Sequence, residues 1–426
     1  MNKLISNTNQ KKLPIIISIG TLILSFLFFS EWLQKSQIIK FPSGAKQAIC
    51  LIYFLTFFFI GNNKFRIHRK YLTYLIIILI FITINYFVAD VRPLNYFLGI
   101  LFTFNFVTIF LLSSNTNLSI TTIIKFLKFL LYLILFFSIP PLIGGLIDGD
   151  SLRTHPGLFR EAGALGTTMN CGLIIAVSLF IFTKKKIYLY FALFLTFGVF
   201  FTTLKKAIIC SCIIWFTYAY FFLSFRKMLN FLIYSISFLF LSILFVGAQI
   251  LQDIYENIDY LERAGDEHVR LAMYLASFKI ANNYFPFGCG LGSFGSIPSL
   301  IGSYSKIYYE YGIADIQPLG PEIVASGATH MLFDTYWPHI LGEMGFLGFI
   351  LFSLIWLFPI SKSLKALKNI NDNIFIKSAA FFIFSITILV TIEGFTLYTP
   401  EIPAFVFLES GIGGYLFYHL KTSKVL

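Results

Sequence analysis

The sequence Pro286-Phe287-Gly288-Cys289-Gly290-Leu291-Gly292-Ser293-Phe294 lies inside a polar interval that runs from Leu251 to Glu343. This is the only long polar interval in a chain that otherwise consists of apolar runs. The interval also contains His330, and the chain returns to apolar sequence through Asp334-Thr335-Tyr336-Trp337-Pro338-His339. A membrane chain that keeps one long segment outside the lipid is expected to carry its functional groups there.

The composition excludes a soluble domain and a single-anchor protein. Hydrophobic residues make up 57% of the 426 residues and charged residues 12%, and the mean hydropathy is +0.80. The formal net charge is +12, but the basic residues sit in short segments between apolar runs and form no nucleic-acid-binding face. None of the five cysteines has metal-site spacing, so we expect no metal and no disulfide framework.

The apolar runs predict an all-α polytopic membrane protein. A span needs roughly 20 apolar residues. The first run lacks a small-residue cleavage site, so we interpret it as a retained span. About twelve transmembrane helices are predicted, over residues 13–30, 46–61, 71–89, 94–113, 124–147, 163–182, 187–204, 206–224, 229–250, 334–360, 374–394 and 402–420.

The basic residues predict the orientation of these spans. With the N-terminus inside, 20 of the 32 Lys and Arg residues fall on inner segments, although the longest loop is outside. Asp372 is the only acidic residue on an inner segment. We therefore expect both termini in the cytoplasm and the long loop outside. The chain divides into residues 1–250 with nine spans, the outer loop 251–333, and residues 334–426 with three spans.

The outer loop has an organisation of its own. Residues 253–283 contain no Pro and one Gly, and their apolar residues recur mostly at helical spacing, which predicts one or two helices at the membrane surface. Pro286 is expected to end this region, and the glycine run to form tight turns. The run is no dinucleotide fingerprint, because no strand precedes it.

Three carboxylates lie within the late predicted spans: Glu343, Glu393 and Glu409. Ionisable groups are costly in lipid and face a cavity or a partner there. All three fall in the predicted outer halves and, with His339, indicate a polar cavity open to the outside. The alternative is that each one simply joins neighbouring helices.

Several motifs in order resemble one known family over residues 150–350. Arg270, a helix, the run 286–294, a His-bearing segment and Glu343-Met344-Gly345-Phe346-Leu347-Gly348 opening a span resemble the O-antigen polymerase/ligase family. The segment Thr154-His155-Pro156-Gly157-Leu158-Phe159-Arg160-Glu161 is similar to the outer loop of that family. Thr203-Leu204-Lys205-Lys206 stands where members often carry a Ser-Arg pair.

The resemblance implies a GT-C-like, metal-independent glycosyltransferase without a cofactor. It would join oligosaccharides carried on undecaprenyl diphosphate on the periplasmic face of the bacterial inner membrane. A chain-length regulator and a flippase of the same pathway are expected partners, and nucleic acid is not.

Such a reaction needs cations for the diphosphate and a base for the acceptor hydroxyl. The cation candidates are Arg160, Arg270, Lys205 and Lys206, because guanidinium and ammonium groups both bind phosphate; headgroup anchoring is the alternative. His330 is the first candidate base, because an unperturbed imidazole titrates near pH ~6.5. Asp334 is the second, because members of the family often place a His-Asn pair about where this chain has Asp334-Thr335, four residues after His330. The candidates for binding glycan or lining the cavity are Tyr336, Trp337, His339 and Glu343.

Two other functions stay open at this point. A ligase that moves finished glycan to a lipid A core or a protein would use the same donor. A flippase for lipid-linked oligosaccharide is a different class, but the sequence shows no internal repeat and no ionisable groups in the cytoplasmic halves of the spans.

Overall fold

A computed structural model describes residues 45–60, 67–148, 162–228, 269–316, 319–325, 332–333, 335–369, 373–396 and 401–422, and the single residues 19, 23, 26 and 27. These residues form helices and turns, with no strand among them. The longer elements are α2 (Ala45–Ile60), α3 (Arg69–Val88), α4 (Pro93–Ser113), α5 (Ile120–Asp148), α6 (Ala162–Thr183), α7 (Lys186–Phe201), α8 (Lys205–Phe222), α10 (Val269–Asn283), α13 (Tyr336–Lys368), α14 (Ile374–Glu393) and α16 (Gly413–Thr422). The short ones are η2 (Ile297–Leu300), α11 (Lys306–Glu310), α12 (Pro321–Ala325), α15 (Pro403–Val406) and the π-helical η5 (Phe407–Ile412).

Seven of the helices in the described ranges are long and apolar enough to cross a membrane: α3, α4, α5, α6, α8, α13 and α14. The predicted spans at 46–61 and 187–204 coincide with the shorter apolar helices α2 and α7. The last predicted span, 402–420, is made of α15, η5 and α16 in succession. The predicted spans at 13–30 and 229–250 lie almost wholly or wholly outside the described residues.

Apolar side chains on the outside of the bundle identify it as membrane-embedded. On α3, Leu79, Ile80 and Phe87 are 61%, 56% and 79% exposed. Monomeric soluble proteins rarely expose apolar patches of this kind, whereas lipid accepts them. The protein is therefore a polytopic α-helical membrane protein, and its helical fold class is confirmed to this level.

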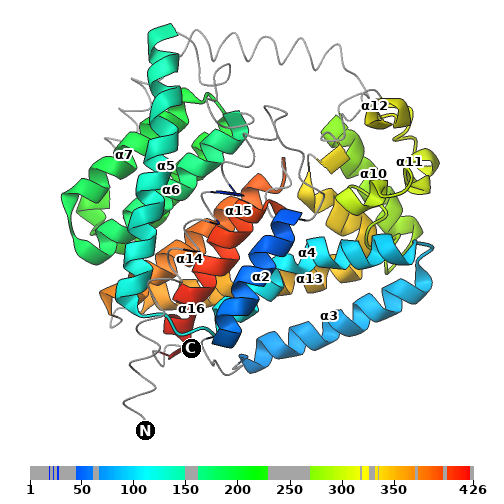
Figure 1. Cartoon of the computed structure of the whole chain (residues 1–426), viewed down its shortest axis with the longest axis horizontal. Coiled ribbons are helices and arrows are strands. Elements are labelled where there is room, and N and C mark those ends of the chain that lie inside the picture. Colours follow the sequence, from blue (N-terminus) through cyan, green and yellow to red (C-terminus); the bar gives the residue numbers. More distant parts are fainter. Residues whose placement is uncertain are drawn as a thin grey trace.

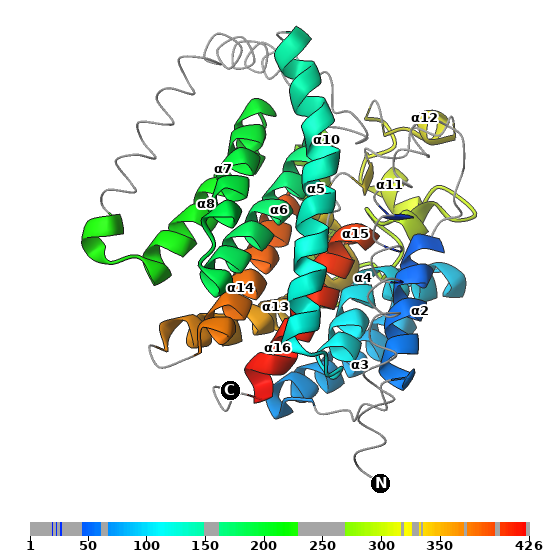
Figure 2. The same ribbon diagram turned by 60° about the vertical axis from the view of Figure 1, so that its left-hand side comes forward.

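Polar contacts between helices occur at both ends of the bundle. At one end, Lys362 Nζ lies 3.1 Å from His68 Nε2, and Lys421 Nζ donates to Asn115 Oδ1 at 3.3 Å. At the other end, the Asn95 amide of α4 donates to the carbonyl of Ile301 in the 269–333 segment. Helices α10, α11 and α12 lie together on one side of the bundle (Figures 1 and 2).

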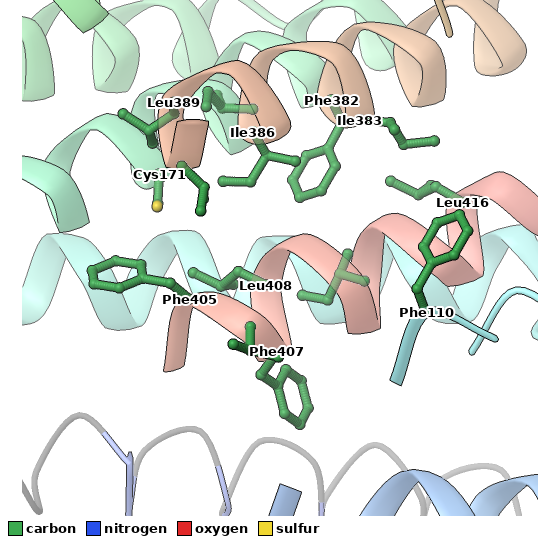
Figure 3. Packing of buried hydrophobic residues seen from close by; sticks show 14 of the residues in the cluster. Phe110, Cys171, Phe382, Ile383, Ile386, Leu389, Phe405, Phe407, Leu408 and Leu416 are labelled. Carbon is green, nitrogen blue, oxygen red and sulfur yellow. The ribbon is translucent and has the colours of Figure 1, made fainter. Parts of the chain in front are cut away.

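The centre of the bundle is a layer of apolar side chains between α14 and the α15–α16 region. Phe382, Ile386 and Leu389 of α14 face Phe405 and Leu408 across this layer (Figure 3). All five are at most 4% exposed. This packing fixes the end of α14, where the candidate site lies.

Helix α13 reverses direction at Gly345, and this corrects the prediction of one continuous span over 334–360. Gly345 has φ 63° and ψ −174°, outside helical geometry. Trp337 and Trp356 would lie about 28 Å apart in a straight helix, yet their ring centroids are 5.8 Å apart. We call residues 336–344 the half-helix and residues 346–368 the long arm. The apolar pattern continues on both sides of Gly345, so the sequence alone does not indicate the reversal.

The glycine run of the 269–333 segment packs into this reversal. Gly288, Gly290 and Gly292 all have positive φ, which confirms the predicted tight turns. A Cβ at Gly345 would lie 2.5 Å from both the nitrogen of Gly288 and the oxygen of Pro286. The two backbones therefore touch directly, and no side chain fits between them.

The reversal predicts a contrast between two glycine substitutions. Gly345→Ala should destabilise the protein by at least about 3 kcal/mol, because its backbone region is essentially restricted to glycine and the methyl group would meet backbone atoms. Gly413 in α16 is helical, and a Cβ there would have no neighbour within 4 Å. Gly413→Ala should therefore leave stability unchanged or raise it by about 0.5–1 kcal/mol. Thermal aggregation of the two variants in detergent measures the difference; equal stability would contradict the close contact at Gly345.

Candidate functional site

The half-helix is buried along its whole length. Each residue from 335 to 345 is buried. Non-helical backbone and short helical arms are tolerated at membrane depth only when protein surrounds them. Tyr336, His339 and Glu343 are spaced three and four residues apart, so their side chains lie along one face. The half-helix thus carries a row of polar side chains into the protein interior.

Glu343 joins the half-helix to the glycine-rich turn. Its Oε1 accepts hydrogen bonds from the Phe294 backbone N–H at 2.9 Å and from Ser296 Oγ at 2.6 Å. Backbone bonds from Cys289 to Gly342 O and from Gly290 to Glu343 O run beside them. In the described structure, Glu343 therefore connects elements, as the alternative interpretation of the buried carboxylates expected.

His339 lies against a carboxylate that sequence reasoning missed. Its Nε2 is 3.4 Å from Glu401 Oε1, and both side chains are buried. The hydroxyl of Tyr336 and Oε2 of Glu343 are also buried, and none of these four atoms has a hydrogen-bond partner in the described structure. Buried polar atoms of this kind are normally satisfied by ordered water or a ligand. Glu401 precedes the last predicted span in the sequence Pro400-Glu401-Ile402-Pro403, and an acidic residue between two prolines was the signal for it.

The other two predicted intramembrane carboxylates are buried in different surroundings. Glu393, at the end of α14, lies 3.0 Å from Lys206 Nζ of α8. Glu409 is in the π-helical segment and lines a small cavity with Tyr71 and Thr387. In the described structure the three carboxylates therefore have different neighbours: Glu343 bonds to the glycine-rich turn, Glu393 pairs with Lys206, and Glu409 lines a separate small cavity. The outward-open cavity stays a prediction.

Lys206 is placed by a strained turn between α7 and α8. Thr203 has φ 54°, an unusual backbone conformation for a β-branched residue. Two residues later α8 begins with Lys205, which is exposed, and Lys206, whose side chain is 22% exposed. The Lys206 ammonium also donates to Thr396 Oγ1 at 3.0 Å. The positive end of the helix dipole and two lysines therefore point to the same region.

Arg270 lies on another helix that contacts this region. It is in the first turn of α10, four residues before Tyr274, whose hydroxyl donates to Phe395 O at 2.9 Å. Burial raises the pKa of Tyr274 to about 12, and the nearby Arg270 charge opposes that rise. Residues 394–396, which we call the α14 turn, therefore lie beside Lys206 and contact Tyr274, one helical turn after Arg270.

The half-helix begins at this turn as well. The Tyr336 backbone N–H donates to Gly394 O at 2.9 Å, and the indole of Trp337 donates to Thr391 O at 2.9 Å. Helix α10 runs alongside the reversal, because Tyr274 contacts the α14 turn and its other end leads into the turn at Gly288. It is thus packed against α13 and forms the 269–283 part of the helical region predicted over 253–283.

The structure brings some predicted site residues together and leaves others unplaced. Lys206 contacts the α14 turn, Trp337 contacts Thr391 just before it, and Arg270 lies one helical turn from Tyr274, which contacts Phe395. Lys205 is the neighbour of Lys206 in the sequence. Tyr336, His339 and Glu343 follow along the half-helix. Arg160, His330 and Asp334 lie outside the described residues. Within the described ranges, no three His, Cys, Asp or Glu side chains are grouped as metal ligands.

The Lys206–Glu393 pair predicts a rescue experiment. Lys206→Met should destabilise the protein by about 3 kcal/mol, because it leaves the fully buried Glu393 carboxylate without its cation. Lys206→Met combined with Glu393→Gln should recover most of this loss. The exposed Lys205→Met is the matched control and should change stability by less than about 0.5 kcal/mol. Thermal unfolding in detergent measures all three, and the pairing would be refuted if the double variant were as unstable as the single one.

Comparison with known proteins leaves the site to be understood from its own residues. No protein-family model matches the chain, and no curated protein matches it.

Proposed function

We propose that the protein is an O-antigen polymerase, a glycosyltransferase that joins oligosaccharides carried on undecaprenyl diphosphate at the periplasmic face of the inner membrane. The observation that supports this proposal is that two separate helices bring basic residues toward the α14 turn: Lys206 of α8 donates to Thr396, and Arg270 of α10 lies one helical turn before Tyr274, which donates to Phe395 O. Two cations beside the outer end of an apolar bundle suit an anionic headgroup on a lipid.

The proposed diphosphate site combines the ammonium group of Lys206, which is held in place, with the guanidinium group of Arg270. Lys206 is held by Glu393 and Thr396 at the N-terminus of α8, where the helix dipole adds positive potential. Arg270 has a planar guanidinium that can bind two phosphate oxygens at once. Lys205 and Arg160 complete the proposed set of cations.

The proposed reaction needs little from the protein besides binding and a base. The acceptor sugar hydroxyl attacks the anomeric carbon of the donor, a new C–O bond forms, and the bond from that carbon to the diphosphate oxygen breaks. Undecaprenyl diphosphate leaves with the bonding electrons, and the base takes the hydroxyl proton. His330 is the proposed base and Asp334 the alternative, and the reaction uses no metal or cofactor.

The half-helix would form the wall of this site. Trp337 lies at the α14 turn, and Tyr336, His339 and Glu343 continue the wall inward. We assign Tyr336 and His339 to the glycan side, Trp337 to the apolar side of the cavity, and Glu343 to the attachment of this wall to the glycine-rich turn. The unsatisfied polar atoms of Tyr336 and His339 make this wall suitable for hydroxyl-rich groups or water.

The proposal extends to the whole chain. About twelve spans in a GT-C-like arrangement, with cytoplasmic termini, would place the 269–333 segment in the periplasm. A flippase delivering the donor and a regulator of chain length would be the pathway partners. A ligase is the alternative within the same chemistry, and a flippase is the alternative outside it.

Deletion of the gene followed by gel analysis of lipopolysaccharide tests the proposal. A core carrying a single repeat supports a polymerase. Bare core with accumulating lipid-linked polymer indicates a ligase, and absence of periplasmic lipid-linked repeats indicates a flippase. The latter two outcomes would overturn the proposal.

Complementation of this deletion with Arg270 variants tests the diphosphate site. Arg270→Lys should shorten the polymer almost as severely as Arg270→Ala, because lysine keeps the charge but loses the two-pronged contact. Lys279→Ala, also exposed on α10, is the matched control and should leave chain length unchanged. Near-normal polymer from Arg270→Lys at equal protein abundance would mean that Arg270 supplies charge alone.

Separate measurement of binding and turnover tests the base. His330→Ala should keep donor binding and lower turnover by roughly 10²–10⁴-fold, since a general base contributes about that much. Asp334→Asn should keep most of the turnover. The reverse pattern, with normal turnover in His330→Ala and loss in Asp334→Asn, would move the base to Asp334.

A further inference from the structure

An apolar groove of about 280 Å³ lies between α10, both arms of α13 and the end of α14. Its walls include Phe278 of α10, Trp337 of the half-helix, Phe349 and Trp356 of the long arm, and Phe395 of the α14 turn. The reversal at Gly345 creates this groove, because it places Trp337 beside Trp356.

The groove offers almost no polar group to an occupant. The indole nitrogens of Trp337 and Trp356 already donate to Thr391, and the Ser353 hydroxyl donates to Phe349 O within its own helix. Phe278 and Phe395 at its rim are 54% and 52% exposed. A hydrocarbon chain fits such a surface, whereas a sugar or peptide would lose hydrogen bonds there.

Cationic groups lie at one place along the groove. Tyr274 and Phe395 both line it, and they are joined by the hydrogen bond from the Tyr274 hydroxyl to Phe395 O. Arg270 is one helical turn before Tyr274, and Lys206 donates to Thr396, the residue after Phe395. An occupant with an apolar chain and an anionic headgroup would match both the apolar groove and these basic residues.

We propose that the groove holds the isoprenoid chain of a polyprenyl diphosphate, with the diphosphate at the α14 turn between Lys206 and Arg270. The inference rests on the proposed function, and it adds a binding place for the lipid chain of the donor. A single groove suits a single chain, because the second acyl chain of a phospholipid would gain nothing from it. The aromatic walls present flat faces to the methyl branches of an isoprenoid.

The test compares a lipid with its headgroup. The full chain in phosphatidylcholine nanodiscs is titrated with geranylgeranyl diphosphate and, separately, with inorganic pyrophosphate, and protein-free discs are subtracted. The wild type should bind geranylgeranyl diphosphate at least about tenfold more tightly than pyrophosphate. Ser353→Leu, which fills the groove, should remove most of this preference and leave pyrophosphate affinity unchanged.

Thr83→Leu is the matched control. Thr83 is an exposed residue on α3 whose hydroxyl also donates within its own helix, to Leu79 O, so the chemical change is the same outside the groove. The Thr83→Leu variant should prefer geranylgeranyl diphosphate over pyrophosphate to the same extent as the wild type. Phe278→Ala, which removes an exposed wall of the groove, is the second test variant and should also reduce the preference.

The outcomes separate the two proposals. Equal affinity of the wild type for lipid and pyrophosphate, or an undiminished preference in both Ser353→Leu and Phe278→Ala, would overturn the groove while leaving the diphosphate site intact. Displacement of geranylgeranyl diphosphate by an equal amount of phosphatidylglycerol in the discs would show a general lipid site and also overturn it. Binding of neither probe would remove the diphosphate site and this inference with it.

Discussion

The direct backbone contact between Gly288 and Gly345 determines how the other parts of the candidate site are arranged. A side chain at either position would separate the glycine-rich turn from α13. Because the contact is this close, α13 can reverse and place its half-helix against its own long arm. The buried polar row, the groove and the attachment of Tyr336 to the α14 turn all follow from that reversal.

Charges near the site are satisfied in two different ways. Glu343 receives hydrogen bonds from a backbone N–H and a hydroxyl, so neutral donors stabilise it. Glu393 lies beside an ammonium group, and Lys206 remains partly exposed. The Lys206 ammonium has three N–H donors, so it can contact a further anion while it stays paired with Glu393 and Thr396. This difference makes Lys206 a suitable binding group and Glu343 a suitable structural one.

The sequence predicted the helices better than their arrangement. Long apolar runs located α3, α4, α6 and α14 within a few residues, because lipid requires about 20 apolar residues in each span. The same length rule predicted one span over residues 334–360. A straight apolar helix and two apolar helical arms joined by a turn have the same composition, so the rule cannot separate them. Only the backbone conformation of Gly345 distinguishes the two.

The candidate site was predictable in its residue types and less so in its partners. Lys206 and Arg270 are predicted from the sequence as phosphate-binding cations. The structure places Lys206 against the α14 turn and Arg270 one helical turn before Tyr274, which contacts that turn. Tyr274 and Thr396 were missed, because neutral residues give no charge signal, and Glu401 was missed although its place between two prolines was a signal. Their roles depend on contacts between segments far apart in the sequence, such as Tyr274 with Phe395.

The burial of the half-helix has a consequence for the order in which the chain is made. Its surroundings come from both directions along the sequence: Asn85 of α3 holds Phe287 of the adjoining turn, and Glu401 lies beside His339. During synthesis, residues 336–344 emerge well before α14 and residue 401 exist to enclose them. Until then His339 lacks Glu401, whereas Phe294 and Ser296, the partners of Glu343, have already been made. Residues after 373 therefore complete the enclosure of a polar group that is synthesised before them.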